Sequence, residues 1–384
     1  MNLKWPFWVV LVGVGLLVAI ALSVLISVGG IALTWDPEEG GNLVEISSLD
    51  SILNRPRFEP PKFSETPKNI GFRPEKHRQP SAPVSSGIDV KSVAEMGTDI
   101  EDEEMVLGLA IDGQARAYPI NMLSDPNREI LNDELAGRTV AVTWCDLCQS
   151  GLVYDRVLDG KTLTLFVTGS LWNGNMVMQD VETQSMFGQV TGHADGGPLQ
   201  GSILTKLPAT ATDWKSWRES YPSTTILALS RVTNQYKHHE RYAEYSGEKK
   251  FFDRMVVGIT DQAGESTRAW TFPLLRRVRI VNNVSPDQKP IVVMFDSRLS
   301  SATIFSRTVA GQELSFRIEE DQVRDLETGS TWNPLTGDAV GGALQGQALE
   351  LLPSTVTFSS SWSKLFPKGQ IISELPEVSG GHPG

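Results

Sequence analysis

The chain holds two cysteines, Cys145 and Cys148, and they lie close together in the segment Val-Thr-Trp-Cys-Asp-Leu-Cys-Gln-Ser-Gly. Such a pair can form a small disulfide, exchange electrons with another thiol pair, or supply two sulfur ligands to one metal ion. Because the chain has no cysteine elsewhere, we expect both thiols to serve one purpose. The candidate functional site is therefore placed at these two residues.

A metal centre is the first hypothesis for this pair. Met178 follows the cysteines along the chain, and His193 lies in a loop beyond it. Thiolate, thioether and imidazole ligands suit copper(I), while thiolates and imidazole suit zinc. We therefore group Cys145, Cys148, Met178 and His193 as a candidate copper or zinc site. The structural alternative is that methionine fills a core and that His193 lies on a surface loop.

Two other hypotheses stay open. A Trp-Cys-x-x-Cys segment after a β-branched strand is similar to thioredoxin-like proteins, which exchange thiols and disulfides. The residues after Cys148 predict another strand, however, where such proteins have a helix. The third hypothesis is a non-enzymatic binding or assembly module that carries a local disulfide. The sequence leaves open whether the protein is an enzyme.

The composition is that of a folded protein with room for two domains. Of its 384 residues, 40% are apolar, and ten tryptophans and fourteen phenylalanines can fill large cores. The formal net charge of −12 argues against nucleic acid as a partner, because no basic surface would neutralise the phosphates. A protein partner fits this composition but is not identified by it.

The N-terminal segment predicts a membrane anchor. Residues 6–33 carry no charged side chain, and this run exceeds the roughly 20 residues that a helix needs to cross a bilayer. We expect a single-pass transmembrane anchor over residues 1–35, with Lys4 on the cytoplasmic side and the bulk of the chain on the extracytoplasmic side. A long cleaved signal peptide is the alternative. The compartment would then be oxidising.

The segment after the anchor, residues 36–100, is polar and rich in proline, and it predicts a tether or an arm that lies over the folded part. The folded part contains an internal duplication. Several segments recur at one offset of 145 residues: Asp180–Thr183 as Asp325–Thr328, Gly196–Gly201 as Gly341–Gly346, and Trp217 as Trp362. We expect a first repeat over 105–231, a linker over 232–254, a second repeat over 255–375, and a flexible tail over 376–384.

Each repeat has the pattern of a β protein. Short apolar runs rich in β-branched residues, such as 139–144 and 291–295, alternate with turn residues such as Asn173-Gly174. Residues 213–219 form the best short helix of the first repeat. The expected class is mainly β, an α+β fold with few short helices, arranged as a tandem duplicated domain behind the transmembrane helix.

The two repeats differ at the cysteines. When Val142 is aligned with Val293, Asp296 lies opposite Cys145 and Leu299 lies opposite Cys148. The second repeat therefore keeps the frame and lacks the thiols. This difference predicts a site in the first repeat and a supporting role for the second.

The sequence also resembles a known family. The residues that carry the resemblance are Ala117-Tyr118-Pro119, Asn132-Asp133, Val142–Cys148 and Tyr154–Arg156. They are similar to the prokaryotic domain-of-unknown-function family 3179, whose hallmark is V-T-[YW]-C-P-L-C-x-[ST]-[AG]. The resemblance extends over about 105–375 and implies no particular activity. The chain departs from the family pattern at Asp146, Gln179 and Met186-Phe187, all of which flank the cysteines in the expected fold.

Overall fold

The computed structural model describes residues 72–375 except 86–87, 98, 230–251, 262, 298 and 300, together with the backbone of two short strands, β1 (Ala32–Thr34) and β2 (Val44–Ile46). These two strands pair with each other in a first unit, Met1–Glu59, and all other described residues belong to a second unit, Pro60–Gly384. The predicted anchor (apart from strand β1) and the tail lie outside the described residues. Within the described part of the chain, no helix is both long and apolar enough to cross a membrane.

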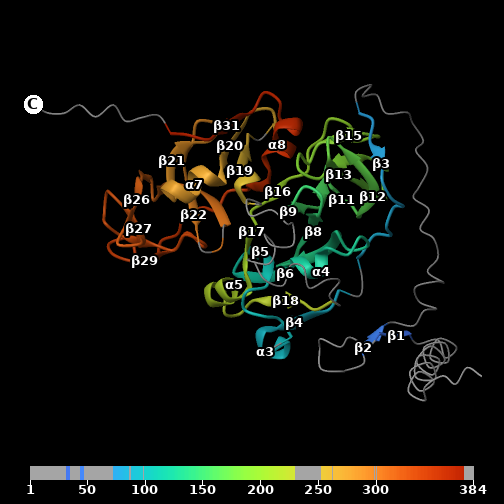
Figure 1. Ribbon diagram of the computed structural model, residues 1–384, viewed down its shortest axis with the longest axis horizontal. Helices are drawn as coiled ribbons and strands as arrows, with labels where there is room; N and C mark the ends of the chain where they lie inside the picture. The colour runs from blue at the N-terminus through green and yellow to red at the C-terminus, as the bar shows by residue number, and fades with distance from the viewer. Residues whose placement is uncertain are drawn as a thin grey trace, which may run out of the picture. The chain divides into compact units, whose positions relative to one another are not determined.

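The second unit is mainly β with short helices, which confirms the predicted class. Its first half holds three sheets, which we call the β5, β8 and β13 sheets after a central strand (Figure 1). The β5 sheet has the order β17-β5-β6-β18-β4: Thr210–Asp213, Met105–Ile111, Gln114–Pro119, Thr225–Leu227 and Val90–Ser92. The β8 sheet has the order β16-β9-β8-β7: Lys206–Leu207, Ser150–Asp155, Arg138–Cys145 and Ile130–Leu135. The β13 sheet has the order β15-β14-β13-β12-β3: Ala194–Gly196, Met186–Gly188, Asn175–Asp180, Leu165–Trp172 and Glu75–Lys76.

The second half repeats this order of elements. One sheet has the order β30-β19-β20-β31: Thr355–Phe358, Met255–Thr260, Thr267–Thr271 and Gln370–Ile372. The next has the order β21-β22-β23: Ile280–Val284, Pro290–Asp296 and Ser301–Ser306. The last has the order β26-β27-β28-β29: Phe316–Glu319, Gln322–Asp325, Thr331–Trp332 and Ala339–Gly341. A small ribbon precedes the last sheet of each half: β10-β11 (Val157–Leu158, Lys161–Thr162) and β24-β25 (Thr308–Val309, Gln312–Glu313).

Short helices join these strands. They are α3 (Val93–Met96), α4 (Ile120–Leu123), α5 (Trp214–Ser220), α7 (Phe272–Val278) and α8 (Ser359–Leu365), with a 3-10 turn η3 at Phe252–Arg254. Helix α5 is the helix expected near 213–219. Asp213 caps its N-terminus, because the carboxylate accepts a hydrogen bond from the Ser216 backbone N–H at 2.6 Å.

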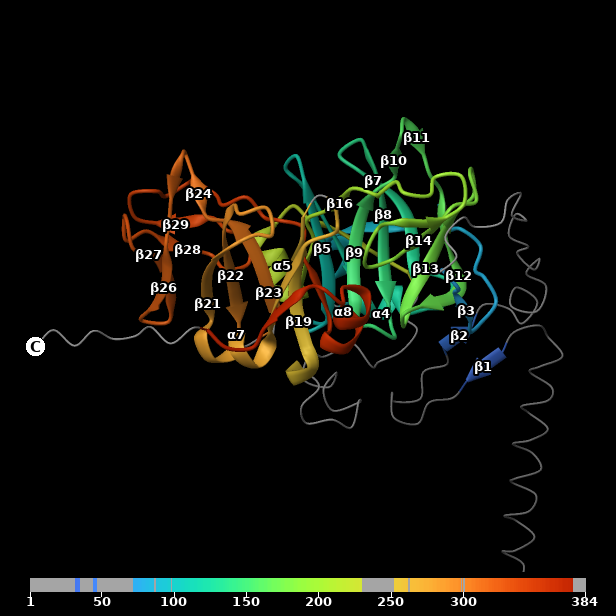
Figure 2. The same ribbon diagram turned by 90° about the horizontal axis from the view of Figure 1, so that it is seen from above.

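Strand β8 is buried on both faces, which explains its nearly unbroken apolar sequence. Successive side chains of a strand point to opposite faces. Val142 and Trp144 therefore pack into a core shared with the β5 sheet, whereas Ala141 and Cys145 pack into a core shared with the β13 sheet. The cysteine-bearing sheet is thus the middle layer of the first repeat (Figure 2).

The repeated tryptophans fill the cores, as the sequence indicates. Trp217 and Trp362 are fully buried, and each packs on a glycine of the first strand of its repeat. A Cβ atom at Gly108 would lie 2.2 Å from the Trp217 ring, and one at Gly258 would lie 2.2 Å from the Trp362 ring. Each glycine is therefore required by the close approach of an indole.

The two repeats pack against each other reciprocally. Strand β30 of the second repeat lies against β9 of the first, and β17 of the first lies against β23 of the second. The Ser301 hydroxyl donates to the Ala211 backbone carbonyl at 2.5 Å, and the Lys206 ammonium donates to the Thr355 hydroxyl at 3.0 Å. The core around the cysteines includes Trp362 of the second repeat. The second repeat therefore supplies part of the wall of the cysteine site.

Candidate functional site

The two cysteines form a disulfide across the turn that joins β8 to β9. Cys145 is the last residue of β8 and pairs with Ser150, the first residue of β9, so the turn comprises residues 146–149. The Cα atoms of the cysteines are 5.6 Å apart. Both cysteines are buried, Cys145 at 3% exposure and Cys148 at 0%, whereas Leu147 between them is 63% exposed. A strand follows the pair, as the sequence predicts.

Cys148 is held by side-chain hydrogen-bonding groups. The Asn175 side-chain amide donates to its Sγ atom at 3.1 Å, and the Ser150 hydroxyl oxygen lies 3.2 Å from the same sulfur. Asn175 and Ser150 are both buried, at 1% and 0% exposure. The Asn175 amide is the kind of group that stabilises a thiolate, because an N–H directed at the sulfur favours its charged form. The Ser150 hydroxyl donates its one hydrogen to Gln189 and lies beside the sulfur.

Gln189 joins these groups into one network. Its Oε1 atom accepts from the Ser150 hydroxyl at 2.9 Å and from the Asn175 amide at 3.0 Å. Its Nε2 atom donates to the Thr143 hydroxyl at 3.0 Å and to the Ser150 carbonyl at 3.2 Å. The Asn175 Oδ1 atom accepts from the Val190 backbone N–H at 2.8 Å. Every amide atom of Asn175 and Gln189 therefore has a partner, and such a satisfied buried network fixes its members in place.

The second repeat has no equivalent network. The hairpin β12–β13 runs from Leu165 to Asp180, whereas its counterpart β26–β27 runs only from Phe316 to Asp325. The extra residues in the first repeat carry Asn175 and extend β12 far enough to pair with β3. At the offset of 145 residues, the position of Gln189 is taken by Pro334. The polar network is thus found where the cysteines are.

The second repeat closes the site from the other side. The Thr357 hydroxyl donates to the Cys148 backbone carbonyl at 2.7 Å, and the Phe358 backbone N–H donates to the same carbonyl at 3.4 Å. Both donors belong to the end of strand β30. The second repeat thus contributes both hydrogen-bond donors to the Cys148 carbonyl.

The four residues predicted as metal ligands occupy two different environments. Met178 is fully buried in the same apolar core as Cys145 and Cys148. His193 lies where the two repeats meet, with its imidazole against Gly264 of the second repeat, and burial lowers its pKa. Across the described residues, no group of three or more histidine, cysteine, aspartate or glutamate side chains is placed to hold a metal ion.

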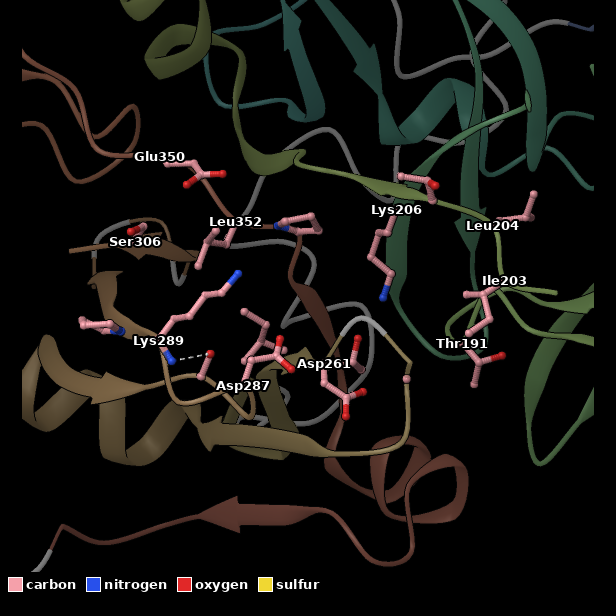
Figure 3. Close-up of a pocket in the computed structure, with 17 residues that line it drawn as sticks. Thr191, Ile203, Leu204, Lys206, Asp261, Asp287, Lys289, Ser306, Glu350 and Leu352 are labelled. Carbon is pink, nitrogen blue, oxygen red and sulfur yellow. Dashed lines mark hydrogen bonds between the residues drawn. The ribbon is translucent and has the colours of Figure 1, made fainter. Parts of the chain in front are cut away.

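A cleft of about 540 Å³ lies between the repeats, and its lining includes Thr191 of the first repeat and Gly264 of the second (Figure 3). Lys206 enters it from β16, and Lys289, Asp261 and Asp287 enter it from the second repeat. Burial lowers the pKa of Lys206 to about 8, and its ammonium donates to the Val190 carbonyl at 3.2 Å as well as to Thr355. Neither cysteine is among the residues that line this cleft.

Sequence reasoning missed the polar partners of the sulfur. Asn175, Gln189, Ser150 and Thr143 are ordinary residues in strand and loop segments, and no motif distinguishes them. The sequence did contain one signal. Asn175 is a polar residue at the start of the otherwise apolar run Asn-Met-Val-Met, and this segment has no match in the second repeat. A polar residue in an apolar strand that only one repeat contains indicates a local task.

The comparison with protein families gives one match that extends over most of the chain. The model of the family described as "Protein of unknown function (DUF3179)" matches residues 87–369. The chain belongs to this family. The match includes both repeats and confirms the resemblance recognised in the sequence. No curated protein and no solved structure matches the chain.

Outside the cysteine segment, residues that carry the resemblance to the DUF3179 family make structural contacts in this protein. The Tyr118 hydroxyl donates to the Asp133 carboxylate at 2.8 Å, which ties β6 to β7. The Tyr154 hydroxyl donates to the Gln189 backbone carbonyl at 2.7 Å, which fixes the loop that carries the network glutamine. The family description names no activity, so the function has to be argued from the geometry of the cysteine site.

Proposed function

We propose that the protein is a thiol–disulfide redox protein whose Cys145–Cys148 pair is reduced and reoxidised by a partner dithiol or disulfide. The observation that carries this proposal is the buried Asn175 amide, which donates to the Cys148 sulfur at 3.1 Å. A disulfide sulfur is a poor hydrogen-bond acceptor, so a buried donor at this position stabilises the reduced state more than the oxidised state.

The exchange proceeds in two successive displacement reactions at sulfur. A thiolate of the partner dithiol attacks the sulfur of Cys145, the cysteine with the greater residue exposure (3% against 0%). The bond between the cysteine sulfurs breaks, and Cys148 leaves as a thiolate. The second thiolate of the partner then attacks the mixed disulfide, which releases Cys145 and leaves the partner oxidised. The protein gains two electrons and the partner loses them. The Asn175 amide stabilises the leaving thiolate of Cys148.

A purely structural disulfide explains the geometry less well. Strands β22 and β23 of the second repeat pair in the same register, with Asp296 opposite Ser301 where the first repeat has Cys145 opposite Ser150. The hairpin therefore forms without a disulfide. A bond that closes so short a loop also stabilises the fold little, because the loop-closure entropy that it removes grows with loop length.

The location of the protein belongs to the same proposal. The uncharged run at residues 6–33 supports a membrane anchor with the repeats on the extracytoplasmic side. An oxidising compartment would keep the pair as a disulfide until a reductant reaches it. Accessibility of an engineered surface cysteine to a membrane-impermeant maleimide, in intact cells and after lysis, tests this orientation.

The redox proposal is tested on the full-length chain in detergent. Free thiols are counted under native conditions, before and after equilibration with mixtures of reduced and oxidised dithiothreitol, and the Cys145→Ser/Cys148→Ser variant gives the background. Two thiols that appear and disappear reversibly support the proposal. A pair that is reduced only after unfolding contradicts it. Stoichiometric copper or zinc with both thiols protected from alkylation would instead support the metal hypothesis.

A further inference from the structure

Lys206 places an ammonium group in the cleft where the two repeats meet. It lies on β16, and its side chain points toward the second repeat (Figure 3). The ammonium donates to the Thr355 hydroxyl at 3.0 Å and to the Val190 backbone carbonyl at 3.2 Å. Both acceptors are neutral, and an ammonium group has a third hydrogen to donate. The positive charge is therefore held in position by groups that do not neutralise it.

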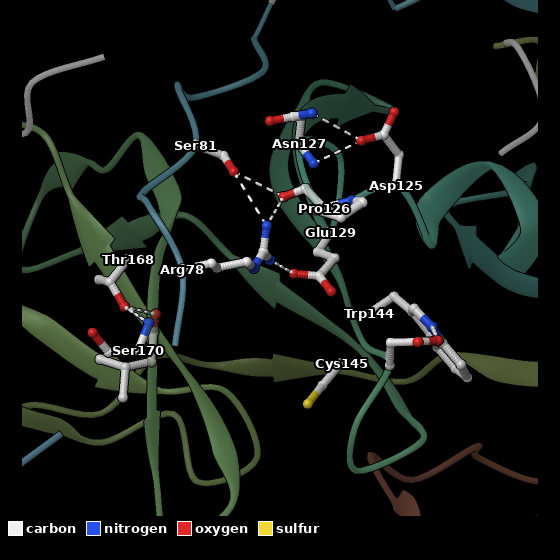
Figure 4. Close-up of polar contacts among 12 residues, drawn as sticks. Arg78, Ser81, Asp125, Pro126, Asn127, Glu129, Trp144, Cys145, Thr168 and Ser170 are labelled. Atoms are coloured by element: carbon white, nitrogen blue, oxygen red, sulfur yellow. Dashed lines mark hydrogen bonds and ion pairs between the residues drawn. The ribbon is translucent and has the colours of Figure 1, made fainter. Parts of the chain in front are cut away.

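The surroundings of Lys206 differ from those of two partly buried cations in the same half of the protein. Arg78 forms an ion pair with Glu129 (Figure 4), and Arg116 forms one with Asp133 at 2.5 Å. Within the described part of the chain, Lys206 has no ion-pair partner. Burial lowers its pKa to about 8, so the group is still mostly charged at neutral pH. Because a charge removed from water is stabilised by an opposite charge, the position favours an anionic group from outside the chain.

The second repeat has an apolar residue at the corresponding position. At the offset of 145 residues, Lys206 aligns with Leu351. The strand contacts are equivalent, because Lys206 pairs with Tyr154 of β9. Leu351 forms the matching bridge with Phe305 of β23. The local fold thus forms with leucine at this position and does not itself require a cation there.

The part of the cleft that the second repeat contributes carries charges of both signs. Asp287 and Lys289 come from the turn between β21 and β22, and Glu350 precedes Leu351. All three side chains are exposed, and among the described residues no ion pair joins any of them to Lys206 or to one another. The cleft therefore keeps opposite charges further apart than an ion pair allows. Its volume of about 540 Å³ is in the range of small-molecule sites.

We propose that this cleft binds a small zwitterionic molecule, an amino acid or a short peptide, with its carboxylate at Lys206 and its amino group at Asp287 and Glu350. The Lys206 ammonium donates its third hydrogen to the carboxylate in a charge-assisted bond. The amino group is attracted by the two carboxylates of the second repeat. A simple anion gains only the first contact and is repelled by those carboxylates. The site is separate from the cysteine pair, so this inference does not rest on the proposed redox function.

The test uses the full-length chain in detergent with its disulfide intact. The probes are glycine, diglycine and triglycine, in which the carboxylate and the ammonium lie at increasing separation. Saturation-transfer NMR titrations measure their affinities, together with those of inorganic phosphate and of the N-acetylated and C-amidated forms of the best probe. We expect at least one zwitterion to bind, and we expect each singly charged form to bind about tenfold or more weakly.

Variants locate the binding in the cleft. Lys206→Leu introduces the residue that the second repeat has at this position, and it should weaken binding of the best probe by about tenfold or more. Asp287→Asn combined with Glu350→Gln should also weaken it. Lys161→Met is the control, because Lys161 is an exposed lysine of β11 that does not line the cleft. It should leave the affinity unchanged.

Several results would overturn the inference. They are equal affinities for the parent and Lys206→Leu, equal affinities for a zwitterion and its acetylated form, and no binding of any probe at millimolar concentration. Phosphate that binds more tightly than every zwitterion would show a simple anion site instead. Should Lys206→Leu not fold, acylation of Lys206 in the parent replaces it, because a bound carboxylate must slow that reaction. An unchanged acylation rate would then count against the proposal.

Discussion

The hydroxyl of Thr357, in the second repeat, donates to the backbone carbonyl of Cys148, in the first, at 2.7 Å. The two residues are 209 positions apart in the chain. Both residues are buried, so neither group can form a hydrogen bond with water in the folded protein. The bond between them satisfies both groups. The bond holds the backbone of the turn that carries the disulfide. The second repeat, which has no cysteines, thereby helps to position Cys148.

Replacing Thr357 by valine should loosen this turn. The change keeps the shape of the side chain and leaves a buried carbonyl with only the longer bond from Phe358. We expect the free energy of unfolding to fall by about 1–2 kcal/mol and the disulfide to be reduced faster by dithiol. Denaturant unfolding and the rate of thiol appearance measure the two effects.

Thr212 provides a matched control for that substitution. It lies at the corresponding position of β17, it is fully buried, and its hydroxyl has no hydrogen-bond partner within the described part of the chain. Thr212→Val should therefore leave the rate of disulfide reduction unchanged and should not lower the stability. Equal acceleration of reduction in both variants would show that general loosening, and not the bond to Cys148, sets the rate.

Asn175 should set the redox equilibrium. Asn175→Ala removes the amide donor at Cys148 and destabilises the thiolate by about 1.5–3 kcal/mol, the range for a hydrogen bond to a charged group. The equilibrium with dithiothreitol should shift toward the disulfide by about tenfold to a hundredfold. Asn132→Ala is the control, because Asn132 bonds both backbone groups of Leu165 and none of the sulfurs. It should destabilise the fold without moving the equilibrium.

Glu129 should make stability depend on pH in a defined direction. Its pKa is raised from 4.5 in the unfolded chain to about 7 in the folded protein, so the folded state binds the proton more tightly. Stability is therefore highest when the group is protonated in both states and falls as pH rises from about 4.5 to 7, by at most about 3 kcal/mol. Glu129→Gln should lack this fall. Urea unfolding at several pH values measures the difference, and parallel pH curves for both proteins would contradict it.

Adding a methyl group at Gly258 should be poorly tolerated. The new Cβ atom would lie 2.2 Å from the Trp362 ring, and that ring is fully buried. Gly258→Ala should lower the free energy of unfolding by about 3 kcal/mol, because overpacking forces the indole out of place. Gly108→Ala should have a similar cost through Trp217. A mild effect at either position would show that the indole can shift without loss of packing.

Much of the fold could be predicted from local patterns. The cysteine hairpin follows from the β-branched apolar run of β8 and from the residues after Cys148. The burial of Trp217 and Trp362 follows from their recurrence, since a residue kept in both repeats serves what both share. Asp180 and Asp325 make matching turns, with carboxylates that accept from Thr183 and Thr328 at 2.7 and 3.0 Å. These features depend on neighbours in the sequence.

The candidate site depended on distant neighbours and was therefore only partly predictable. The sequence pointed to Cys145 and Cys148, but the partners of the sulfur come from a hairpin tip (Asn175) and a loop (Gln189) that only tertiary packing brings together. No spacing rule connects them. Met178 shares the core of the cysteines, while His193 faces the second repeat. Residue type alone could not separate a ligand from a packing residue.

The covalent link between the two repeats has a consequence for how reliably the site is assembled. Strand β30 contacts the cysteine turn from within the same chain, so its effective concentration is set by the connecting residues and does not fall when the protein is diluted. A pair of separate subunits with the same contact would lose it at low abundance. The tandem arrangement thus resembles a permanent heterodimer, in which one half carries the cysteine pair and the other half supplies a constant contact to it.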